Sequence, residues 1–303
     1  MDTFKQRIRK YARFMRLLLA NKTYIYIYIK KRRAYSVDEF LNLLVYLHPL
    51  FCKGFCLKCF ENDVLLLDNG ATKIKVDMRY PVIAWEIFAE HIYELPKAIV
   101  GDRTYSVLDI GANRGYSALY FASLEYVERV FSFELFPDIA KKAAENLALN
   151  PHLNSKIHFH NFGLGATEQT ITAYYLPERD GISSAHLSFL EQYAPEEREH
   201  IQSQQCVVKP ASLVLQDCIE SNKLRHIMLK IDVEGAEYEI MRDLSSHYPQ
   251  IFEYVGIIMG DTHSGFIALL DILRPYSYDV YMAQPHTNGT CPFILIKQGW
   301  LKG

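Results

Sequence analysis

The hydrophobic pattern from Tyr105 onward alternates short apolar runs with stretches in which apolar residues recur every three or four positions. The short runs predict strands, and the intervening stretches predict helices. The predicted strands are Ser106–Ile110, Val130–Glu134, Lys156–Asn161, His226–Ile231 and Tyr254–Met259. Such alternation is typical of a doubly wound sheet with parallel strands and covering helices. We therefore predict an α/β domain over residues 101–303.

Helix starts and the end of the chain support this organisation. A first helix is expected near Arg114, and a second at Pro137, because proline is favoured at the first helical position. Another helix is expected through Ala236–Leu244. The segments Tyr278–Ala283 and Phe293–Lys297 predict a closing hairpin.

Residues 1–100 follow a different pattern and predict a separate extension of helices and one hairpin. Four segments carry this prediction: a basic amphipathic helix over Phe4–Leu19, a run of strong strand formers at Tyr24–Ile29, a helix over Val37–Leu50 that Pro49 ends, and a hairpin of Val64–Leu67 with Lys73–Val76 around Asp68-Asn69-Gly70.

Charge is distributed unevenly along an otherwise ordinary globular chain. Of 303 residues, 50% are hydrophobic and 22% are charged, which excludes disordered and collagen-like classes. The net charge of −2 argues against a chain that coats nucleic acid, so no specific nucleic-acid partner is expected. Residues 1–33, however, hold eleven Lys or Arg and one acid. This basic region predicts either contact with an anionic surface such as a membrane or a solvated helix face.

Targeting signals are absent from the sequence pattern. The longest apolar region, Phe14–Ile29, is interrupted by Arg16 and Lys22, and Leu17–Ala20 is too short for a secretion signal. We therefore expect a cytoplasmic protein, with residues 1–33 as a candidate peripheral contact at the inner membrane surface. The six cysteines are then expected to be free thiols.

A glycine-bearing turn follows the first predicted strand of the α/β domain. Gly111-Ala112-Asn113-Arg114-Gly115 leads into a helix, and backbone N–H groups at a helix N-terminus bind anions. The glycine spacing differs from a dinucleotide fingerprint, and Asp109 precedes the turn, which favours S-adenosylmethionine (SAM) over NAD. We expect Gly111 and Gly115 to admit the methionine portion, Asn113 to hold its carboxylate, and Asp109 to orient the loop or the ammonium group. A tight turn without a ligand is the alternative.

The next two strand ends carry further candidate cofactor residues. Glu134 ends the second strand, where an acid can accept hydrogen bonds from both ribose hydroxyls. Asn161 and Gly163 follow the third strand, where the adenine is expected.

Acidic residues also follow the fourth strand, in the run Lys230-Ile231-Asp232-Val233-Glu234-Gly235-Ala236-Glu237. Asp232 and Glu234 would lie on one side of an extended segment at the ligand-binding edge of the sheet. Glu237 is better explained by the positive end of the next helix. Asp232 and Glu234 are therefore candidate active-site residues.

Together, four motifs resemble those of the FkbM-type SAM-dependent methyltransferases over roughly residues 77–300. The motifs are Asp109-x-Gly111-Ala112-Asn113-x-Gly115-Tyr116, Phe133-Glu134, Asn146-Leu147-x-Leu149-Asn150 and Lys230 to Glu237. The resemblance implies a Rossmann-like class I methyltransferase fold, with a seven-stranded, mostly parallel sheet and one antiparallel strand. It also implies methyl transfer to a hydroxyl oxygen, since known members modify sugars, glycolipids and natural products.

The chain departs from the family at two of its acids. Ser212-Leu213-Val214 lacks the acid of the family's Thr-Leu-Asp segment, and Asp261-Thr262-His263 stands where the family has Glu-x-His. An acceptor alcohol is barely ionised at neutral pH, so we expect a base, with His263 as first candidate and Asp232 as second. Asp232, Glu234, Asp261 and His263 could also form an oxygen-rich metal site, but their spacing does not require one and no metal is predicted.

The expected function is thus SAM-dependent O-methylation of a glycan, glycolipid or related small molecule. Two other classes stay open: a non-catalytic SAM-binding or scaffolding subunit at a membrane surface, and an NAD-dependent oxidoreductase. The spacing of Cys52, Cys56 and Cys59 resembles that of radical-SAM enzymes, but the repeated β/α barrel of those enzymes is not predicted here.

Overall fold

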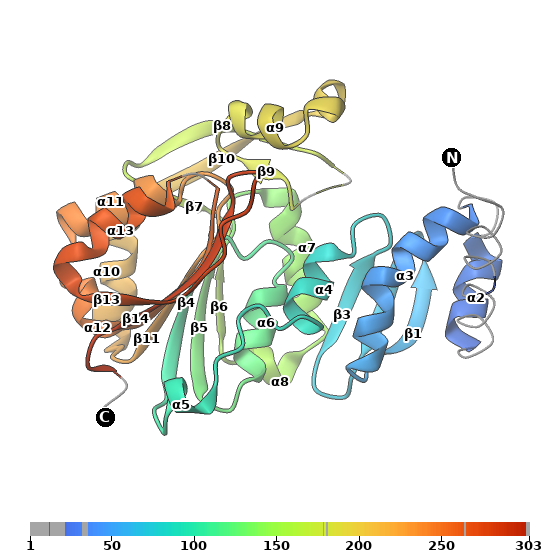
Figure 1. Cartoon of the computed structure of the whole chain (residues 1–303), viewed down its shortest axis with the longest axis horizontal. Helices are drawn as coiled ribbons and strands as arrows, with labels where there is room; N and C mark the ends of the chain where they lie inside the picture. The colour runs from blue at the N-terminus through green and yellow to red at the C-terminus, as the bar shows by residue number, and fades with distance from the viewer. Residues whose placement is uncertain are drawn as a thin grey trace. The chain divides into compact units, whose positions relative to one another are not determined.

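The computed structural model describes Ala12 and residues 22–31, 36–177, 179, 181–263 and 265–300. The chain divides into two compact units, residues 1–90 and 91–303 (Figure 1). The basic helix expected over Phe4–Leu19 lies outside the described residues, apart from Ala12. Within the described ranges, every helix is too short or too polar to cross a bilayer.

The second unit is built on a seven-stranded sheet in the order β13-β14-β12-β11-β4-β5-β6. Neighbouring strands are parallel except that β14 runs antiparallel to both β12 and β13. The mostly parallel sheet and its closing hairpin are therefore confirmed. Its strands are β4 (Tyr105–Ile110), β5 (Val127–Phe133), β6 (Ile157–His160), β11 (Ile227–Ile231), β12 (Val255–Thr262), β13 (Tyr278–Ala283) and β14 (Cys291–Lys297).

Helices cover both faces of this sheet (Figure 1). On one face lie α6 (Tyr116–Ser123), α7 (Pro137–Ala148) and α8 (Pro151–Asn154), and on the other α10 (Ala211–Asn222), α11 (Glu237–His247) and α13 (Phe266–Leu273). Short helices α5 (Lys97–Val100), α12 (Ile251–Tyr254) and η2 (Arg274–Tyr276) complete the unit. The main apolar core includes Leu108, Leu229, Leu244 and Ile258, all fully buried.

The first helix starts later than its sequence predicts. Pro137 opens α7 as expected, but α6 begins at Tyr116 rather than near Arg114. Asn113 and Gly115 have φ values of 48° and 75°, which a right-handed helix cannot contain. The turn therefore extends through Gly115.

A second, four-stranded sheet in the order β7-β10-β8-β9 was not predicted from the sequence. Only Cys206 and Val208 are buried in its inner strand β10, so the apolar signature of a strand is weak there. The sheet and its attached helices are β7 (Gly163–Gly165), β8 (Gln169–Tyr175), β9 (Ser183–Ser184), α9 (Leu187–Tyr193), η1 (Pro195–His200) and β10 (Gln202–Pro210).

The first unit contains the predicted hairpin, extended to a three-stranded antiparallel sheet. Its elements are α2 (Lys22–Lys31), α3 (Val37–Cys52), β1 (Cys56–Glu61), β2 (Val64–Asp68), β3 (Lys73–Asp77) and α4 (Val82–Phe88). Pro49 does not end α3, which continues to Cys52 with the proline inside its last turn. Cys52, Cys56 and Cys59 are exposed free thiols.

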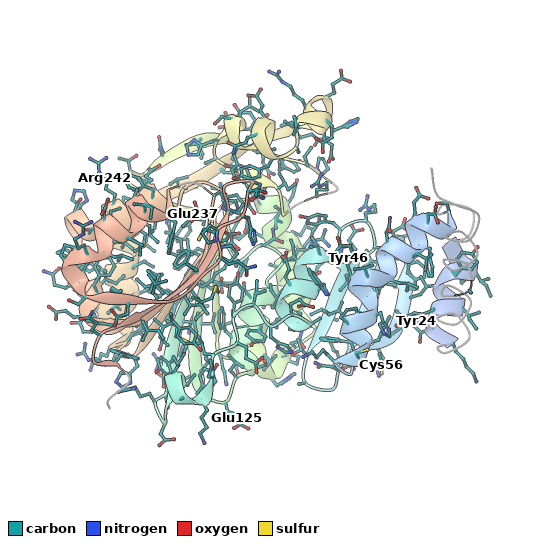
Figure 2. All side chains as sticks on the ribbon, in the orientation of Figure 1. Tyr24, Tyr46, Cys56, Glu125, Glu237 and Arg242 are labelled. Carbon is teal, nitrogen blue, oxygen red and sulfur yellow. The ribbon has the colours of Figure 1, made fainter. Side chains whose placement is uncertain are left out.

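The strand predicted at Tyr24–Ile29 is wrong, because this segment is the helix α2. Tyr24 and Ile27, three residues apart, are buried, whereas Tyr26 and Ile29 are exposed. The Tyr24 hydroxyl lies 2.6 Å from His48 Nδ1 on α3, and Figure 2 labels Tyr24 in this unit. Burial of one helical face thus outweighs the local preference of alternating Tyr and Ile for strands.

A buried lysine joins the ends of β4 and β11 in the second unit. Lys230 is 2% exposed, and its Nζ donates to the carbonyls of Ile110 (3.2 Å) and Gly111 (2.5 Å). The same Nζ lies 3.4 Å from Asp109 Oδ1. Asp109 Oδ2 accepts hydrogen bonds from Ser117 (2.9 Å) and Ser132 (3.0 Å). The turn after β4 is therefore fixed to β11, β5 and α6.

Gly111→Ala should destabilise the second unit more than Gly265→Ala, a substitution at equal φ where the added Cβ meets no clash. A Cβ at Gly111 (φ +85°) would lie 1.9 Å from the Asp232 carbonyl oxygen, whereas at Gly265 (φ +84°) the nearest atom is 3.6 Å away. Both substitutions cost about 1–2 kcal/mol for the left-handed backbone. Gly111→Ala should cost about 1–3 kcal/mol more because of the clash. Denaturant unfolding measures the difference, and equal losses would contradict the close approach.

Candidate active site

The backbone amides of the glycine turn after β4 donate to acceptors at the end of β5. Gly111 and Ala112 both donate to the Phe133 carbonyl, at 3.0 Å and 2.9 Å, and Asn113 N donates to Glu134 Oε2 at 2.8 Å. We expected these amides to bind an anionic ligand directly, but they already have acceptors in the structure. The turn is tight because it is held against the end of β5, and its first anionic partner is the Glu134 carboxylate.

Glu134 lies at the end of β5 and organises the segment that follows it. The residue is 5% exposed, and its Oε1 accepts a hydrogen bond from Phe136 N at 2.8 Å. Asn161 Nδ2 donates to the Glu134 carbonyl at 3.0 Å, and a Cβ on Gly163 would lie 2.6 Å from a Leu135 methyl group. The structure therefore brings Glu134, Asn161 and Gly163 together. The carboxylate accepts hydrogen bonds from the N–H groups of Asn113 and Phe136, and a carboxylate can accept about four.

Asp109 and Asn113 both have hydrogen-bond partners within the protein. Asp109 is completely buried between Lys230, Ser117 and Ser132. Of the two roles expected for Asp109, orienting the loop is the one that these contacts would serve. Asn113 Oδ1 accepts a hydrogen bond from Arg114 N at 2.7 Å, which supports the positive φ of Asn113.

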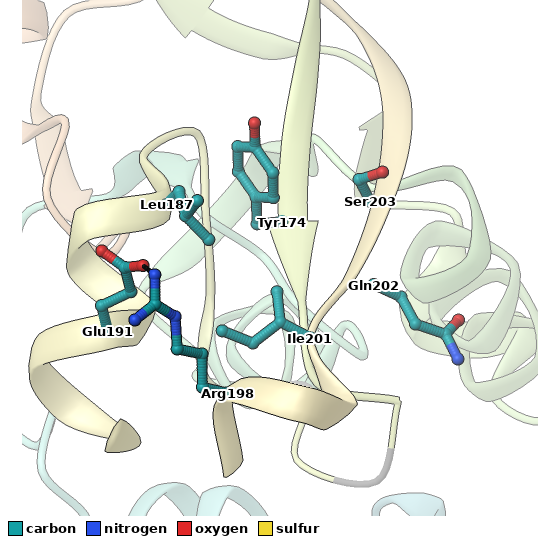
Figure 3. Close-up of a pocket in the computed structure, with 7 residues that line it drawn as sticks. All are labelled: Tyr174, Leu187, Glu191, Arg198, Ile201, Gln202 and Ser203. Carbon is teal, nitrogen blue, oxygen red and sulfur yellow. Dashed lines mark ion pairs between the residues drawn. The ribbon is translucent and has the colours of Figure 1, made fainter. Parts of the chain in front are cut away.

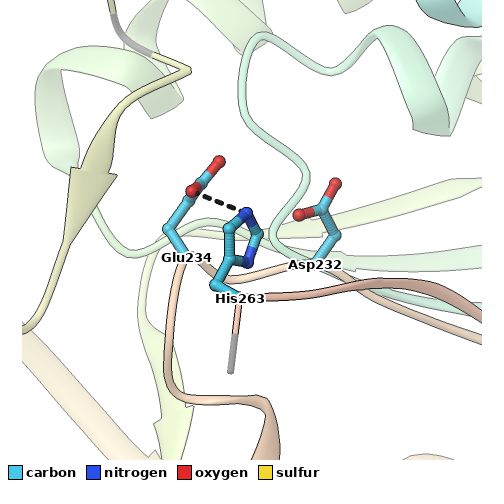
Figure 4. A group of neighbouring side chains, drawn as sticks. All are labelled: Asp232, Glu234 and His263. Atoms are coloured by element: carbon cyan, nitrogen blue, oxygen red, sulfur yellow. Dashed lines mark ion pairs between the residues drawn. The ribbon is translucent and has the colours of Figure 1, made fainter. Parts of the chain in front are cut away.

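A second group of polar side chains lies at the ends of β11 and β12. Asp232, Glu234 and His263 each have a carboxylate oxygen or ring nitrogen within 4.8 Å of those of the other two (Figure 4). His263 Nε2 lies 3.0 Å from Glu234 Oε2. Asp261 belongs to the same edge, because β11 and β12 pair Ile231 with Gly260 and the next residue of each strand end is an acid.

Asp232 and Glu234 converge through a turn rather than along the extended segment that we expected. Glu234 has φ 58°, and β11 ends at Ile231. A non-glycine residue at positive φ costs about 1 kcal/mol or more and marks a constrained site. Ser184 Oγ from β9 donates to the Glu234 carbonyl at 2.6 Å and supports this conformation.

Glu237 is a site residue that the sequence analysis assigned only to the helix end. It is 2% exposed at the start of α11 (Figure 2), and its Oε1 lies 3.2 Å from His263 Nδ1. The same oxygen accepts hydrogen bonds from the N–H groups of Val233 and Gly235, both at 3.1 Å. Glu237 therefore fixes both the turn that carries Asp232 and Glu234, which we call the acidic turn, and the His263 ring. In the sequence, only its position at the end of the Asp232–Glu237 run indicated a role in the site.

Electrostatics make His263 a cation in this arrangement. Burial alone would lower the pKa of His263, but its hydrogen bonds with Glu234 and Glu237 raise the pKa well above its ordinary value. Burial raises the pKa of Glu234, an effect that His263 partly offsets. Burial and the nearby Asp232 charge raise the pKa of Asp261 to about 7. The protonated imidazole thus partly balances a crowded group of acids.

Aromatic side chains surround this group, and the sequence analysis did not identify them. Tyr93 donates from its hydroxyl to Asp232 Oδ2 at 3.3 Å, and the Tyr193 hydroxyl donates to the His263 carbonyl at 2.8 Å. The Phe189 ring meets the His263 ring edge-on, with centroids 5.1 Å apart. Phe189 and Tyr193 belong to α9, and nothing in their local spacing indicates this contact.

A separate pocket of about 260 Å³ lies beside the second sheet (Figure 3). It includes a 2.7 Å ion pair between Glu191 and Arg198. None of the site residues predicted from the sequence lines it. Its lining residues are Tyr174, Leu187, Glu191, Arg198, Ile201, Gln202 and Ser203.

Comparisons with known proteins identify the family. Residues 109–280, more than half of the chain, match the model of the methyltransferase FkbM domain. The chain is 24% identical over 233 residues to Methyltransferase 1 of Beauveria bassiana (strain ARSEF 2860), covering 74% of this chain and 89% of that protein. It is 26% identical over 195 residues to Methyltransferase sdnD of Sordaria araneosa, covering 56% and 71%.

Several solved structures of methyltransferases match parts of this chain at low identity, including the following two. A crystal structure of methyltransferase FkbM from Methylobacillus flagellatus KT is 16% identical, covers 86% of this chain and 61% of that chain, and has a TM-score of 0.39. A human methyltransferase 10 domain containing protein is 12% identical, covers 76% and 90%, and has a TM-score of 0.43.

The family match spans the glycine turn, Glu134, the Asp232–Glu237 run and His263. It therefore includes both groups of polar residues at the carboxyl edge of the seven-stranded sheet. The chain belongs to the methyltransferase FkbM domain family and is a SAM-dependent methyltransferase.

Proposed function

We propose that this methyltransferase transfers the methyl group of SAM to a hydroxyl oxygen of a glycan, glycolipid or related small molecule. The observation that carries the proposal is the direct contact between the glycine turn and the acidic turn. Asp232 N donates to the Ile110 carbonyl at 3.1 Å, immediately before the glycine turn. A cofactor held at one turn would therefore lie beside the carboxylates and aromatic rings of the other.

The cofactor side of the site fits SAM. In this proposal Glu134 accepts hydrogen bonds from the ribose, and the contacts of Asn161 and Gly163 with the Glu134–Leu135 segment support a joint role for the three residues. Bound SAM supplies a methyl group that its sulfonium already activates. What this chain must add is alignment of an acceptor oxygen for in-line attack, and such positioning supplies most of the rate enhancement.

The hydroxyl proton needs an acceptor, and we propose Asp232 for this role. His263 was the first candidate from the sequence, but both of its ring nitrogens face carboxylates and its raised pKa keeps it protonated. A protonated imidazole cannot accept a further proton. Asp232, the second candidate, has a carboxylate oxygen within 4.8 Å of a His263 ring nitrogen. The Tyr93 hydroxyl donates to this carboxylate and orients it.

The surroundings of Asp232 favour an acceptor rich in hydroxyl groups. Carboxylates accept hydrogen bonds from hydroxyls, and aromatic rings pack against the C–H faces of a sugar. Tyr193, which is only partly buried, supplies such a ring next to His263. We also propose that the basic residues 1–33 bring the enzyme to an anionic membrane surface from the cytoplasm, where a glycolipid acceptor would be found.

Glu134→Gln should weaken SAM binding by about 10–100-fold, because hydrogen bonds to a charged group are worth about 1.5–3 kcal/mol. Isothermal titration calorimetry with SAM measures the affinity, and thermal unfolding checks that the turn has not collapsed. The matched control is Glu128→Gln, at the other, exposed end of β5. Wild-type affinity in a folded Glu134→Gln variant would contradict the ribose contact.

Asp232→Asn should lower methyl transfer by about 10²–10⁴-fold, the usual contribution of a positioned base, while leaving SAM affinity within a few fold. The assay follows label from methyl-labelled SAM into a panel of glycosides and extracted glycolipids. The exposed Asp217→Asn on α10 is the control. The product should resist mild alkali, as a methyl ether does; an alkali-labile ester would contradict hydroxyl methylation.

Replacement of Lys30, Lys31, Arg32 and Arg33 by Gln should weaken binding to vesicles containing phosphatidylserine. Basic residues near an anionic surface contribute about 1 kcal/mol each, so sedimentation with vesicles should fall strongly and should also fall in high salt. Neutral phosphatidylcholine vesicles are the control. Unchanged sedimentation of the variant would contradict a membrane role for this region.

A further inference from the structure

The group at the ends of β11 and β12 has the donor geometry of a metal site. Asp232, Glu234 and His263 each offer one ligand atom, and these atoms lie within 4.8 Å of one another (Figure 4). The 3.0 Å between Glu234 Oε2 and His263 Nε2 equals the separation of two adjacent ligands at about 2.1 Å from an octahedral ion.

Charge around this group is unbalanced toward the negative. Four carboxylates belong to it, those of Asp232, Glu234, Glu237 and Asp261. In the part of the chain that the structure describes, the ion pairs of these acids are made with His263 alone. Lys230, the nearest lysine in sequence, is instead paired with Asp109. A divalent cation would supply the missing positive charge.

The second ring nitrogen of His263 is held as in a metal site. Nδ1 lies 3.2 Å from Glu237 Oε1, and that oxygen is fixed by two backbone N–H groups. A histidine ligand usually donates its other N–H to a carboxylate, which sets the tautomer and leaves the remaining nitrogen for the ion. Glu237 thus directs His263 Nε2 toward Glu234 and Asp232.

We propose that Asp232, Glu234 and His263 bind a divalent cation of the Mn²⁺ or Mg²⁺ type, with Glu237 as the positioning residue for His263. Two carboxylates favour Mg²⁺ or Mn²⁺, and the imidazole shifts the preference from Mg²⁺ toward Mn²⁺. On binding, Nε2 loses its proton to solvent, and the Glu234 oxygen that paired with it turns to the ion.

The ion would also serve the acceptor, an inference that rests on the proposed function. Three protein ligands leave open positions on a six-coordinate ion. An acceptor hydroxyl bound there would be oriented and made more acidic. Each acid offers one oxygen to the ion, so the second oxygen of Asp232 stays within reach of the hydroxyl proton.

Direct titration with Mn²⁺ alone tests the site without an acceptor. The full chain is treated with chelator and titrated, and electron paramagnetic resonance measures the free Mn²⁺ that remains. We expect one bound ion per chain. His263→Gln and Asp232→Asn should each weaken binding at least tenfold, and Glu237→Gln by about 10–100-fold through the misplaced imidazole.

Controls separate this proposal from loss of the fold and from failure of the proposed function. Asp271→Asn, exposed on α13, should bind Mn²⁺ as the wild type does. Each variant should still bind SAM, which shows that the cofactor side is intact. Absence of Mn²⁺ binding, or binding that these variants leave unchanged, overturns the metal site even if methyl transfer is observed. Mn²⁺ binding that the variants abolish supports the site even if no tested hydroxyl is methylated.

Discussion

The buried ammonium group of Lys230 is the interaction on which the site depends. An unpaired charge at this depth would be strongly destabilising, but Asp109 and the carbonyls of Ile110 and Gly111 surround it. These partners all belong to the end of β4 or to its turn, whereas Lys230 itself is on β11. One side chain therefore holds the glycine turn against the acidic turn, and the absence of a Cβ at Gly111 lets their backbones touch.

The acidic turn is held in place by contacts that offset the repulsion between its carboxylates. Four acids lie close together, and Glu234 has a left-handed backbone conformation. Glu237 offsets part of this cost, since one of its oxygens accepts two backbone N–H groups and faces His263. Local strain of this kind persists only where the surroundings over-determine it, and it is common at functional sites. A cation between the acids would relieve the remaining repulsion.

The sequence predicts what depends on local pattern and fails where tertiary packing decides. Strands such as β4 and β11 are buried on both faces, so their apolar runs are unambiguous. The Tyr24–Ile29 run favours a strand by propensity, yet contact of Tyr24 with His48 on α3 makes it a helix. The strand β10 carries only a weak apolar signal, since Cys206 and Val208 are its buried residues. Glu237 was visible in its motif, but its contact with His263 joins residues far apart in sequence.

The same contrast between local pattern and tertiary packing distinguishes the cofactor side of the site from the acceptor side. The residues expected to hold the cofactor, from Asp109 to Gly163, follow three successive strands and can be read in order along the chain. The acceptor side takes Tyr93 from the segment before β4, Phe189 and Tyr193 from α9, and His263 from the end of β12. Loops and short helices of this kind tolerate change better than the strands that they connect. Acceptor choice can therefore diverge through α9 and the second sheet while the Lys230–Asp109 contact keeps the cofactor turn in place.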